Sequence, residues 1–211
     1  MSVLVPMPVK PGLNTRILNK MYANLYRLMN IVDMEVVFDY GRYPKHYDDE
    51  NFFARLARMR QQMIEDFLRP RHTDVLWIDA DVLEYPSTLY TDLRRVSSGV
   101  VSPLVLIEDS PVNYDTAGMR QSFEHRSGME PPYFTGEGPL YDMESVGGCV
   151  LVPAKVHRKV KFEAQADDDQ NWVTEWWSVC QGAKEMGYAV QCTTDIVVRH
   201  ANLPQYGEDY H

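Results

Sequence analysis

An unbroken apolar run, Val-Leu-Trp-Ile at residues 75–78, constrains the fold of this chain more than any other segment. A strand with one covered face alternates apolar and polar side chains, whereas a strand covered on both faces is apolar throughout. The run is bounded by Asp74 and Asp79, which gives it the length of a strand. It therefore predicts a central strand with helices packed on both faces of its sheet.

Strand-length apolar runs alternate with segments of helical period along the rest of the chain, which favours an α/β fold with crossover helices. Asn14 or Thr15 is the expected cap of the first helix. We expect strands at residues 3–5, 34–38, 75–78, 100–103, 146–152 and 196–198, and helices at residues 18–29, 52–67, 87–95 and 174–186. The sheet is expected to be mixed and mostly parallel.

The 211 residues contain no internal repeat and no linker, so a single domain is expected. Residues 1–107 are interpreted as a donor-binding half and residues 108–211 as an acceptor or lid half. A polar segment rich in Gly and Pro, at residues 108–144, lacks a clear period. Because loops of this length are usually functional, it is expected to form part of a substrate-facing surface, the alternative being an irregular excursion.

The charge and cysteine content exclude several classes of protein. The chain has 21 Lys and Arg against 30 Asp and Glu, a net charge of −9, which opposes sequence-independent binding to nucleic-acid phosphates. Cys149, Cys180 and Cys192 are odd in number and form no C-x-x-C pair, so neither a disulfide framework nor a zinc knuckle is expected. The chain has no apolar stretch of membrane-spanning length and no signal-peptide pattern, so a soluble cytoplasmic protein is expected, with no membrane partner.

Two carboxylates, Asp79 and Asp81, follow the apolar run directly. In open α/β sheets, ligands bind outside the carboxyl ends of the strands. If strand geometry persists, both side chains project to the same side and repel each other unless a cation lies between them. Mg²⁺ and Mn²⁺ are commonly held by one or two carboxylates plus substrate phosphates, so the pair predicts a metal-assisted diphosphate site. The alternative is a solvated turn whose acids cap the next helix.

This acidic segment, with Pro86 and the helix after it, resembles the D-x-D segment of the fungal mannan polymerase mannosyltransferases, which have the GT-A glycosyltransferase fold. Three further segments are similar to that family in the same order. They are the glycine pair, strand and His-Arg pair at residues 146–158, the helix at residues 174–188, and residues 197–202 around His200. The resemblance runs from about residue 73 to residue 203. It implies a GT-A fold, Rossmann-like and in one domain.

The resemblance also implies a reaction: transfer of a hexose from a nucleotide diphosphate sugar, GDP-mannose or a UDP-hexose, to a hydroxyl acceptor, with Mn²⁺ or Mg²⁺. It implies that Asp81 ligates the metal directly, that Asp79 contacts the donor or the metal through water, and that His200 is a further ligand. Glu175 would be the general base if the sugar carbon inverts, or would orient substrate if it is retained, as in the resembled family. An acid that only stabilises a helix start is the alternative for Glu175.

Other candidates follow from their place in the expected fold. The loop after the first strand, residues 6–15 with Pro6 at its start, and Asp39, at the end of the second strand, lie where a GT-A enzyme would hold the nucleoside, although Asp39 would equally suit a turn cap. Gly147 and Gly148 would let the backbone approach an acceptor sugar closely, or form a strand bulge. As an acid at a strand end, Asp81 is expected to be exposed and to contribute little to folding.

Two other functions stay open at this point. A nucleotidyltransferase of similar fold would carry a basic, glycine-rich loop, which Pro-Val-Lys-Pro-Gly at residues 8–12 matches poorly. A sugar- or nucleotide-binding module without turnover is the second. One segment is rich in arginine and contains Arg55, Arg58, Arg60, Arg69 and Arg71. It is expected to be a solvated helix face. The alternative is a site for an anionic acceptor such as a modified base in phage DNA.

Overall fold

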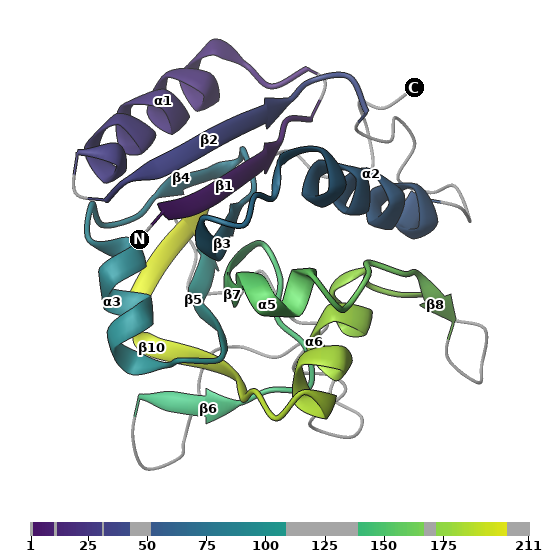
Figure 1. Ribbon diagram of the computed structural model, residues 1–211. Helices are drawn as coiled ribbons and strands as arrows, with labels where there is room; N and C mark the ends of the chain where they lie inside the picture. Colours follow the sequence, from purple (N-terminus) through teal and green to yellow (C-terminus); the bar gives the residue numbers. More distant parts are fainter. Residues whose placement is uncertain are drawn as a thin grey trace.

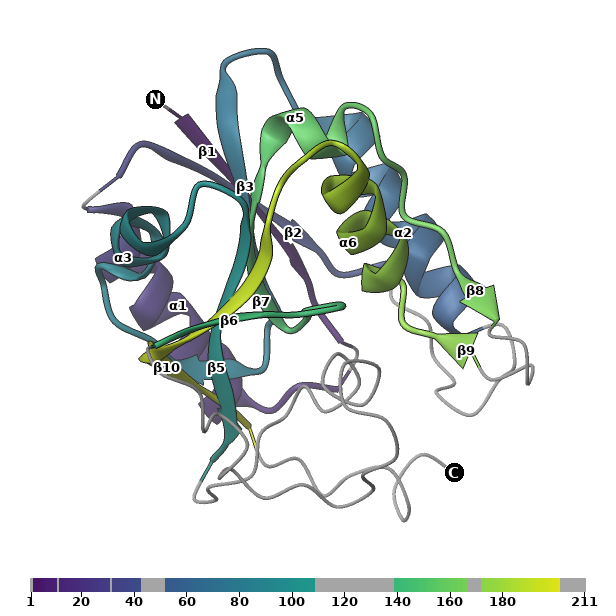
Figure 2. The ribbon, with the colours of Figure 1, turned by 90° about the horizontal axis from the view of Figure 1, so that it is seen from below.

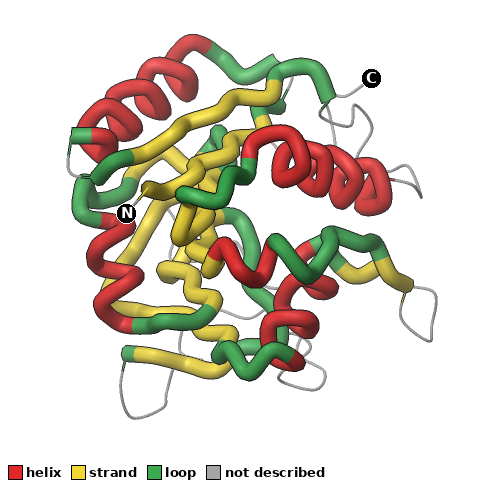
Figure 3. The backbone as a smooth tube through the Cα atoms, in the orientation of Figure 1, coloured by secondary structure: helices red, strands yellow, loops and turns green. Residues whose placement is uncertain are grey.

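The computed structural model describes residues 2–10, 12–30, 32–42, 52–108, 139–166 and 172–201. Within these ranges a central sheet lies between two layers of helices, as Figures 1 and 3 show. The strands are β1 (Ser2–Pro8), β2 (Met34–Asp39), β3 (His72–Ile78), β4 (Val82–Glu84), β5 (Val100–Ile107), β6 (Leu140–Asp142), β7 (Cys149–Pro153), β8 (Gln165–Ala166), β9 (Trp172–Val173) and β10 (Val190–His200). The helices are α1 (Thr15–Met29), α2 (Phe52–Phe67), α3 (Leu89–Val96), α5 (Ala154–His157) and α6 (Trp176–Glu185).

The larger sheet has the strand order β2-β1-β3-β7-β5-β10-β4, and β6 also pairs with β10. β1 is parallel to both β2 and β3, and β10 is parallel to β5. β7 runs antiparallel between β3 and β5, while β4 and β6 run antiparallel to β10. Therefore β1, β2, β3, β5 and β10 share one direction and end at the same edge. The expectation of a mixed, mostly parallel sheet is confirmed.

The side chains of β3 alternate between the two faces of this sheet. Val75 and Trp77 belong to a core cluster with residues of α2, α5 and α6, whereas Leu76 and Ile78 belong to a second cluster with residues of α1 and α3. Figure 2 shows these two groups of helices on opposite sides of the strands. All four side chains are fully buried. The apolar run at residues 75–78 is thus covered on both faces, as predicted.

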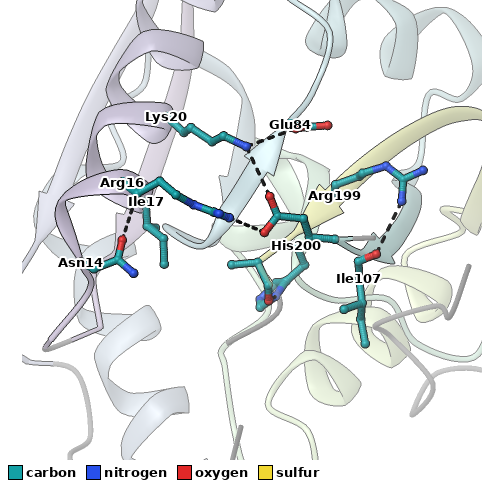
Figure 4. Close-up of polar contacts among 10 residues, drawn as sticks. Asn14, Arg16, Ile17, Lys20, Glu84, Ile107, Arg199 and His200 are labelled. Atoms are coloured by element: carbon teal, nitrogen blue, oxygen red, sulfur yellow. Dashed lines mark hydrogen bonds and ion pairs between the residues drawn. The ribbon is translucent and has the colours of Figure 1, made fainter. Parts of the chain in front are cut away.

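Most element positions agree with the sequence pattern. The helix expected at residues 52–67 is α2, and Asn14 caps α1 by accepting a hydrogen bond from the Ile17 N–H at 3.0 Å (Figure 4). The strand expected at residues 196–198 is the end of a longer one, β10. Residues 109–138 of the polar segment expected to face substrate lie outside the described residues, and the last part of that segment contains β6.

Cys149, Cys180 and Cys192 are buried and form no disulfide bond, as expected. Burial raises the pKa of the Cys149 thiol above its usual range, with the charge of Asp79 as a lesser cause, so this thiol stays protonated. Among the described residues, no helix combines the length and the apolar character needed to cross a membrane.

Gly99, just before β5, leaves no room for a side chain. A Cβ atom built on it would lie 2.3 Å from the carbonyl oxygen of Ala189, which accepts the Val100 N–H at 2.9 Å. We expect Gly99→Ala to lower the free energy of unfolding by about 1–3 kcal/mol, because backbone of both β5 and β10 must shift. Urea denaturation measures this. Gly41→Ala is the control, since nothing lies within 4 Å of its Cβ, and equal stability of the two variants would contradict the prediction.

Candidate active site

Polar side chains gather at the edge where the parallel strands end. Lys10 follows β1, Asp39 ends β2, Asp79 and Asp81 follow β3, and His200 ends β10. Ligands of open α/β sheets bind at this edge. The described residues form two groups here, which we call the Asp81 cluster (Lys10, Asp81 and His200) and the Arg60 cluster (Arg60, Asp79 and Glu175).

Strand geometry does not persist through the acidic pair, because the chain turns after β3. The Val82 N–H donates to the carbonyl of Asp79 at 2.9 Å and closes the turn. The Asp79 N–H donates to the Gly148 carbonyl at 3.0 Å, and the Ala201 N–H donates to the Asp81 carbonyl at 2.7 Å. The turn is thereby held from both sides, by the segment before β7 and by the end of β10. As a result the two carboxylates contact different partners, and the strand geometry on which their projection to the same side depended is not present.

The Asp81 cluster is a buried carboxylate between two nitrogen groups. Oδ2 of Asp81 lies 2.7 Å from Nζ of Lys10, and Oδ1 lies 3.0 Å from Nε2 of His200. Asp81 is 1% exposed and His200 is fully buried, so the expectation of an exposed acid at this position was wrong. Burial alone would raise the pKa of the Asp81 carboxyl, but the charges of Lys10 and His200 hold it below its usual range. Burial opposes protonation of His200, yet Asp81 raises its pKa.

The donor atoms of the Asp81 cluster fit a divalent metal ion. A carboxylate oxygen and an imidazole nitrogen both bind Mn²⁺, and here they lie side by side on adjacent strand ends, since His200 pairs with Val82 across β10 and β4. No group of three or more His, Cys, Asp or Glu side chains in the described ranges is arranged to hold a metal. Asp81 and His200 would therefore supply two ligands, and substrate oxygens and water would complete the shell.

The Arg60 cluster joins two further candidates through a buried arginine. Arg60, on α2, is 3% exposed. Its Nε donates to Oε1 of Glu175 at 2.8 Å, and one terminal nitrogen donates to Oδ1 of Asp79 at 2.9 Å. The guanidinium also lies 5.1 Å from the ring centre of Trp77 and 5.3 Å from that of Trp176. One cation thus fixes an acid from the β3 turn and an acid from the start of α6.

Glu175 occupies the N-cap position of α6, as the resemblance implied, and is 3% exposed. Its side chain makes no capping hydrogen bond to the helix and instead accepts from Arg60. Burial raises the pKa of its carboxyl, while the charge of Arg60 opposes that shift. The interaction with Arg60, rather than the helix dipole, therefore accounts for an acid at this position.

The interpretation of the arginine-rich segment as a solvated face was wrong for Arg60. The helical period of the sequence would have predicted that Arg60 is buried. Leu56 lies four residues before it, and Met63 and Ile64 lie three and four residues after it, so all four share one face of the helix, and the three apolar residues are buried. An arginine on the apolar face of a helix needs a buried acid as its partner. Lys10 lies in the loop of residues 6–15 that was expected at the nucleoside, but its contact with Asp81 was not predicted.

The remaining candidates lie around these clusters. Asp39 accepts hydrogen bonds from the backbone N–H groups of Gly41 and Arg42, both at 3.1 Å, which is the turn cap that was kept as its alternative. Pro6 is buried inside β1 and pairs with Val37, so it does not reach the strand end. Gly148 has a φ of 72°, a left-handed backbone, and its carbonyl holds the Asp79 N–H. Gly147 precedes it and accepts the Cys149 N–H at 2.8 Å.

Helix α1 contributes a charged rim beside the Asp81 cluster. Lys20 donates to Glu84 at 3.2 Å and to Glu108 at 3.3 Å, and Arg16 donates to Glu108 at 2.5 Å. Figure 4 shows Lys20 extending from α1 toward Glu84. Glu108 follows β5, and its N–H donates to the His200 carbonyl at 2.7 Å. The rim thus ties α1 to the strand ends that carry the site.

The fold is that of the GT-A glycosyltransferases, as the comparison with solved structures shows. The chain is similar to GalNAc-T7 crystallised with UDP, GalNAc and Mn²⁺, with a TM-score of 0.50 and 11% identity over 99% of this chain. The family model Anp1 matches residues 50–131, which include the acidic segment after β3, and the resemblance to the mannan polymerase family is confirmed. No curated protein sequence matches the chain.

Two other solved structures are similar at lower TM-scores. A glycosyltransferase involved in glycosylation of the major capsid of PBCV-1 gives a TM-score of 0.39 and 13% identity over 75% of this chain. A Drosophila β-1,4-galactosyltransferase 7 in complex with manganese, UDP-Gal and xylobiose gives a TM-score of 0.43 and 14% identity over 99% of this chain. The match spans 68% of the galactosyltransferase chain. The present chain spans 64% of the PBCV-1 structure and 44% of the GalNAc-T7 structure, less than two thirds of either.

Proposed function

We propose that this protein is a glycosyltransferase that moves a hexose from a nucleotide diphosphate sugar to a hydroxyl acceptor, with Mn²⁺ or Mg²⁺ bound at the Asp81 cluster. The observation that carries the proposal is the contact between Asp81 and His200, 3.0 Å apart and buried at the carboxyl edge of a GT-A sheet. The Anp1 match and the UDP and Mn²⁺ of the GalNAc-T7 structure support it. The family match supports glycosyltransferase activity in particular.

Asp81 and His200 would hold the metal. When bound, the ion supplies charge neutralisation for the departing diphosphate. Asp79 lies in the same turn and is 17% exposed at its side chain, so it stays within reach of a donor while Arg60 fixes its orientation. We assign Glu175 an orienting role that acts through Arg60 and Asp79 rather than that of a general base, because its side chain is 4% exposed and already accepts from Arg60.

The donor and acceptor halves remain part of the proposal. Asp39, Asp79 and Asp81 come from residues 1–107, the half assigned to the donor, and the second proposed metal ligand, His200, comes from the other half. Gly147, Gly148 and Glu175 come from residues 108–211, the half assigned to the acceptor. The site lies where the two meet, since β7 and β10 from the second half pair with β3 and β5 from the first. A DNA acceptor is not proposed, because that idea rested on the arginine-rich segment, and Arg60 of that segment is buried rather than part of an exposed basic face.

The experiment that tests the activity is a panel of UDP-hexoses and GDP-mannose with Mn²⁺ or Mg²⁺, monitored for release of the nucleoside diphosphate. Metal-dependent release of UDP or GDP supports transfer to an acceptor or to water. Binding of a donor without release would indicate a binding module. Pyrophosphate release from a nucleoside triphosphate and a sugar phosphate would indicate a nucleotidyltransferase.

The substitution Asp81→Asn is expected to weaken Mn²⁺-dependent binding of the nucleoside diphosphate by roughly 100-fold or more, since even outer partners of a metal ligand are worth roughly 10–100-fold. Isothermal titration calorimetry with UDP and GDP at fixed Mn²⁺ measures this. Because Asp81 is buried, circular dichroism must show that the variant is folded. Asp33→Asn, an exposed acid just before β2 at the opposite edge, should bind as the unsubstituted protein does. Unchanged binding by Asp81→Asn would remove the site assignment.

A further inference from the structure

Lys10 is the one cation of the Asp81 cluster that the proposed reaction has not used. The chain leaving β1 is held beside the end of β2 by a hydrogen bond of 2.9 Å from the Val9 N–H to the Asp39 carbonyl. From there Lys10 reaches across to the β3 turn, where its Nζ lies 2.7 Å from Oδ2 of Asp81. Its side chain is 13% exposed against 1% for Asp81. Lys10 therefore lies on the open side of the carboxylate.

The two oxygens of Asp81 are divided between two partners. Oδ1 faces His200, and Oδ2 is covered by the Lys10 ammonium. A divalent ion that binds Asp81 brings two positive charges to within a few ångströms of that ammonium, and like charges at such separations repel strongly in a buried site. Lys10 must then move off Oδ2. The side chain is able to do so, because a lysine is a compact charge on a flexible four-carbon stem.

The diphosphate of the donor is the anion that the displaced Lys10 ammonium would bind. In the proposed reaction it binds beside the metal, so its oxygens would lie next to the position that Lys10 vacates. Lysine binds phosphate groups as a point charge and needs no fixed fork geometry. We propose that Lys10 covers Asp81 in the donor-free protein and binds the donor diphosphate once the metal is in place. This inference rests on the proposed function.

The arrangement couples the metal and the nucleotide. Metal alone must displace Lys10 and gains nothing in return, whereas metal with a nucleoside diphosphate gives the ammonium a new partner. Each ligand therefore raises the affinity for the other, and by thermodynamic linkage the two factors are equal. A purely structural ion pair predicts something different: its loss would destabilise the protein without tightening the binding of metal alone.

The test compares the unsubstituted protein with Lys10→Met, which keeps the length of the side chain and removes its charge. Lys20→Met is the matched control, because Lys20 pairs with Glu84 and Glu108 in the neighbouring rim rather than with Asp81. Binding of Mn²⁺ alone is measured from the electron paramagnetic resonance signal of the free ion. Binding of UDP and of GDP at saturating Mn²⁺ is measured by calorimetry.

For Lys10→Met we expect about tenfold tighter binding of Mn²⁺ alone and about tenfold weaker binding of the nucleoside diphosphate, within the usual range of coupling between two sites. Lys20→Met should change neither. Unchanged or weaker Mn²⁺ binding in Lys10→Met overturns the inference and leaves the proposed function standing. If the unsubstituted protein binds neither Mn²⁺ nor a nucleoside diphosphate, the proposed function and the inference both fail. Should Lys10→Met not fold, Lys10→Gln, which retains a donor for Oδ2 without the charge, is held to the same outcomes.

Discussion

Replacing Arg60 by methionine is expected to lower the free energy of unfolding by about 3–5 kcal/mol, the usual cost of removing one partner from a buried ion pair. The loss exceeds that of an ordinary surface charge because Arg60 contacts two acids at once, Asp79 at 2.9 Å and Glu175 at 2.8 Å. Glu175 would be left as a buried carboxyl without its cation. Methionine fills much of the space between the rings of Trp77 and Trp176, so the charge accounts for most of the effect.

Arg58→Met is the control for this prediction, because Arg58 lies on the same helix and is exposed. Its effect should stay within about 0.5 kcal/mol, as for most surface substitutions. Urea denaturation at neutral pH measures both variants. A loss for Arg60→Met no larger than that for Arg58→Met would mean that the two acids do not depend on Arg60.

The charge argument has a second consequence that separates it from packing. Adding Glu175→Gln and Asp79→Asn to Arg60→Met removes the uncompensated acids, so the triple variant should recover part of the stability lost by Arg60→Met alone. If the cost came from lost packing of the guanidinium against the tryptophan rings, the added substitutions would recover nothing. Denaturation of the unsubstituted protein, Arg60→Met and the triple variant side by side distinguishes the two causes.

Local pattern was sufficient for most of the fold. The central strand followed from an apolar run with no polar alternation, and α2 from apolar residues at helical spacing. β10 was predicted too short because its first part alternates buried and partly exposed residues, with Gln191 and Thr194 among them, and its pairing shifts between Thr193 and Val197. The antiparallel place of β7 between β3 and β5 depends on contacts far apart in sequence, which no local pattern records.

The candidate site divides in the same way. Asp79 and Asp81 were predicted because they follow a strand, and strand ends meet at one edge, whereas His200 was assigned from the family resemblance. The burial of Arg60 could have been predicted from the helical spacing of apolar residues around it. It was missed because Arg60 was grouped with the other arginines of the same segment. The loop that contains Lys10 was expected at the site, but the contact of Lys10 with Asp81 could not be predicted, since it spans 71 positions and depends on how far the chain after β1 extends toward the β3 turn.

The free energy of unfolding is expected to fall by about 2 kcal/mol between pH 7 and pH 5 because of His157 alone. His157 is buried against Phe162, and its Nε2 accepts a hydrogen bond from Nε1 of Trp77 at 3.0 Å, so the folded protein needs the neutral ring. Burial, and then the charge of Arg60, lower the pKa of His157 to about 3. In the unfolded chain its pKa is about 6.5. Between these values the unfolded state binds the additional proton, so stability is lost as the pH falls through 6.5 toward 3, by about 1.4 kcal/mol per pH unit once below 6.

The variant His157→Gln isolates this contribution, because the glutamine carbonyl can accept the Trp77 N–H without titrating. Other groups also change stability with pH, among them His200 with its raised pKa and His72, whose pKa is lowered by burial, but they do so equally in both proteins. The quantity to measure is therefore the difference in unfolding free energy between the two proteins from pH 7 to pH 5, by urea denaturation at each pH. It should shift by about 2 kcal/mol in favour of the variant as the pH falls. Parallel profiles would mean that His157 takes up its proton in the folded protein at an ordinary pH, and that the core around Trp77 tolerates the charge.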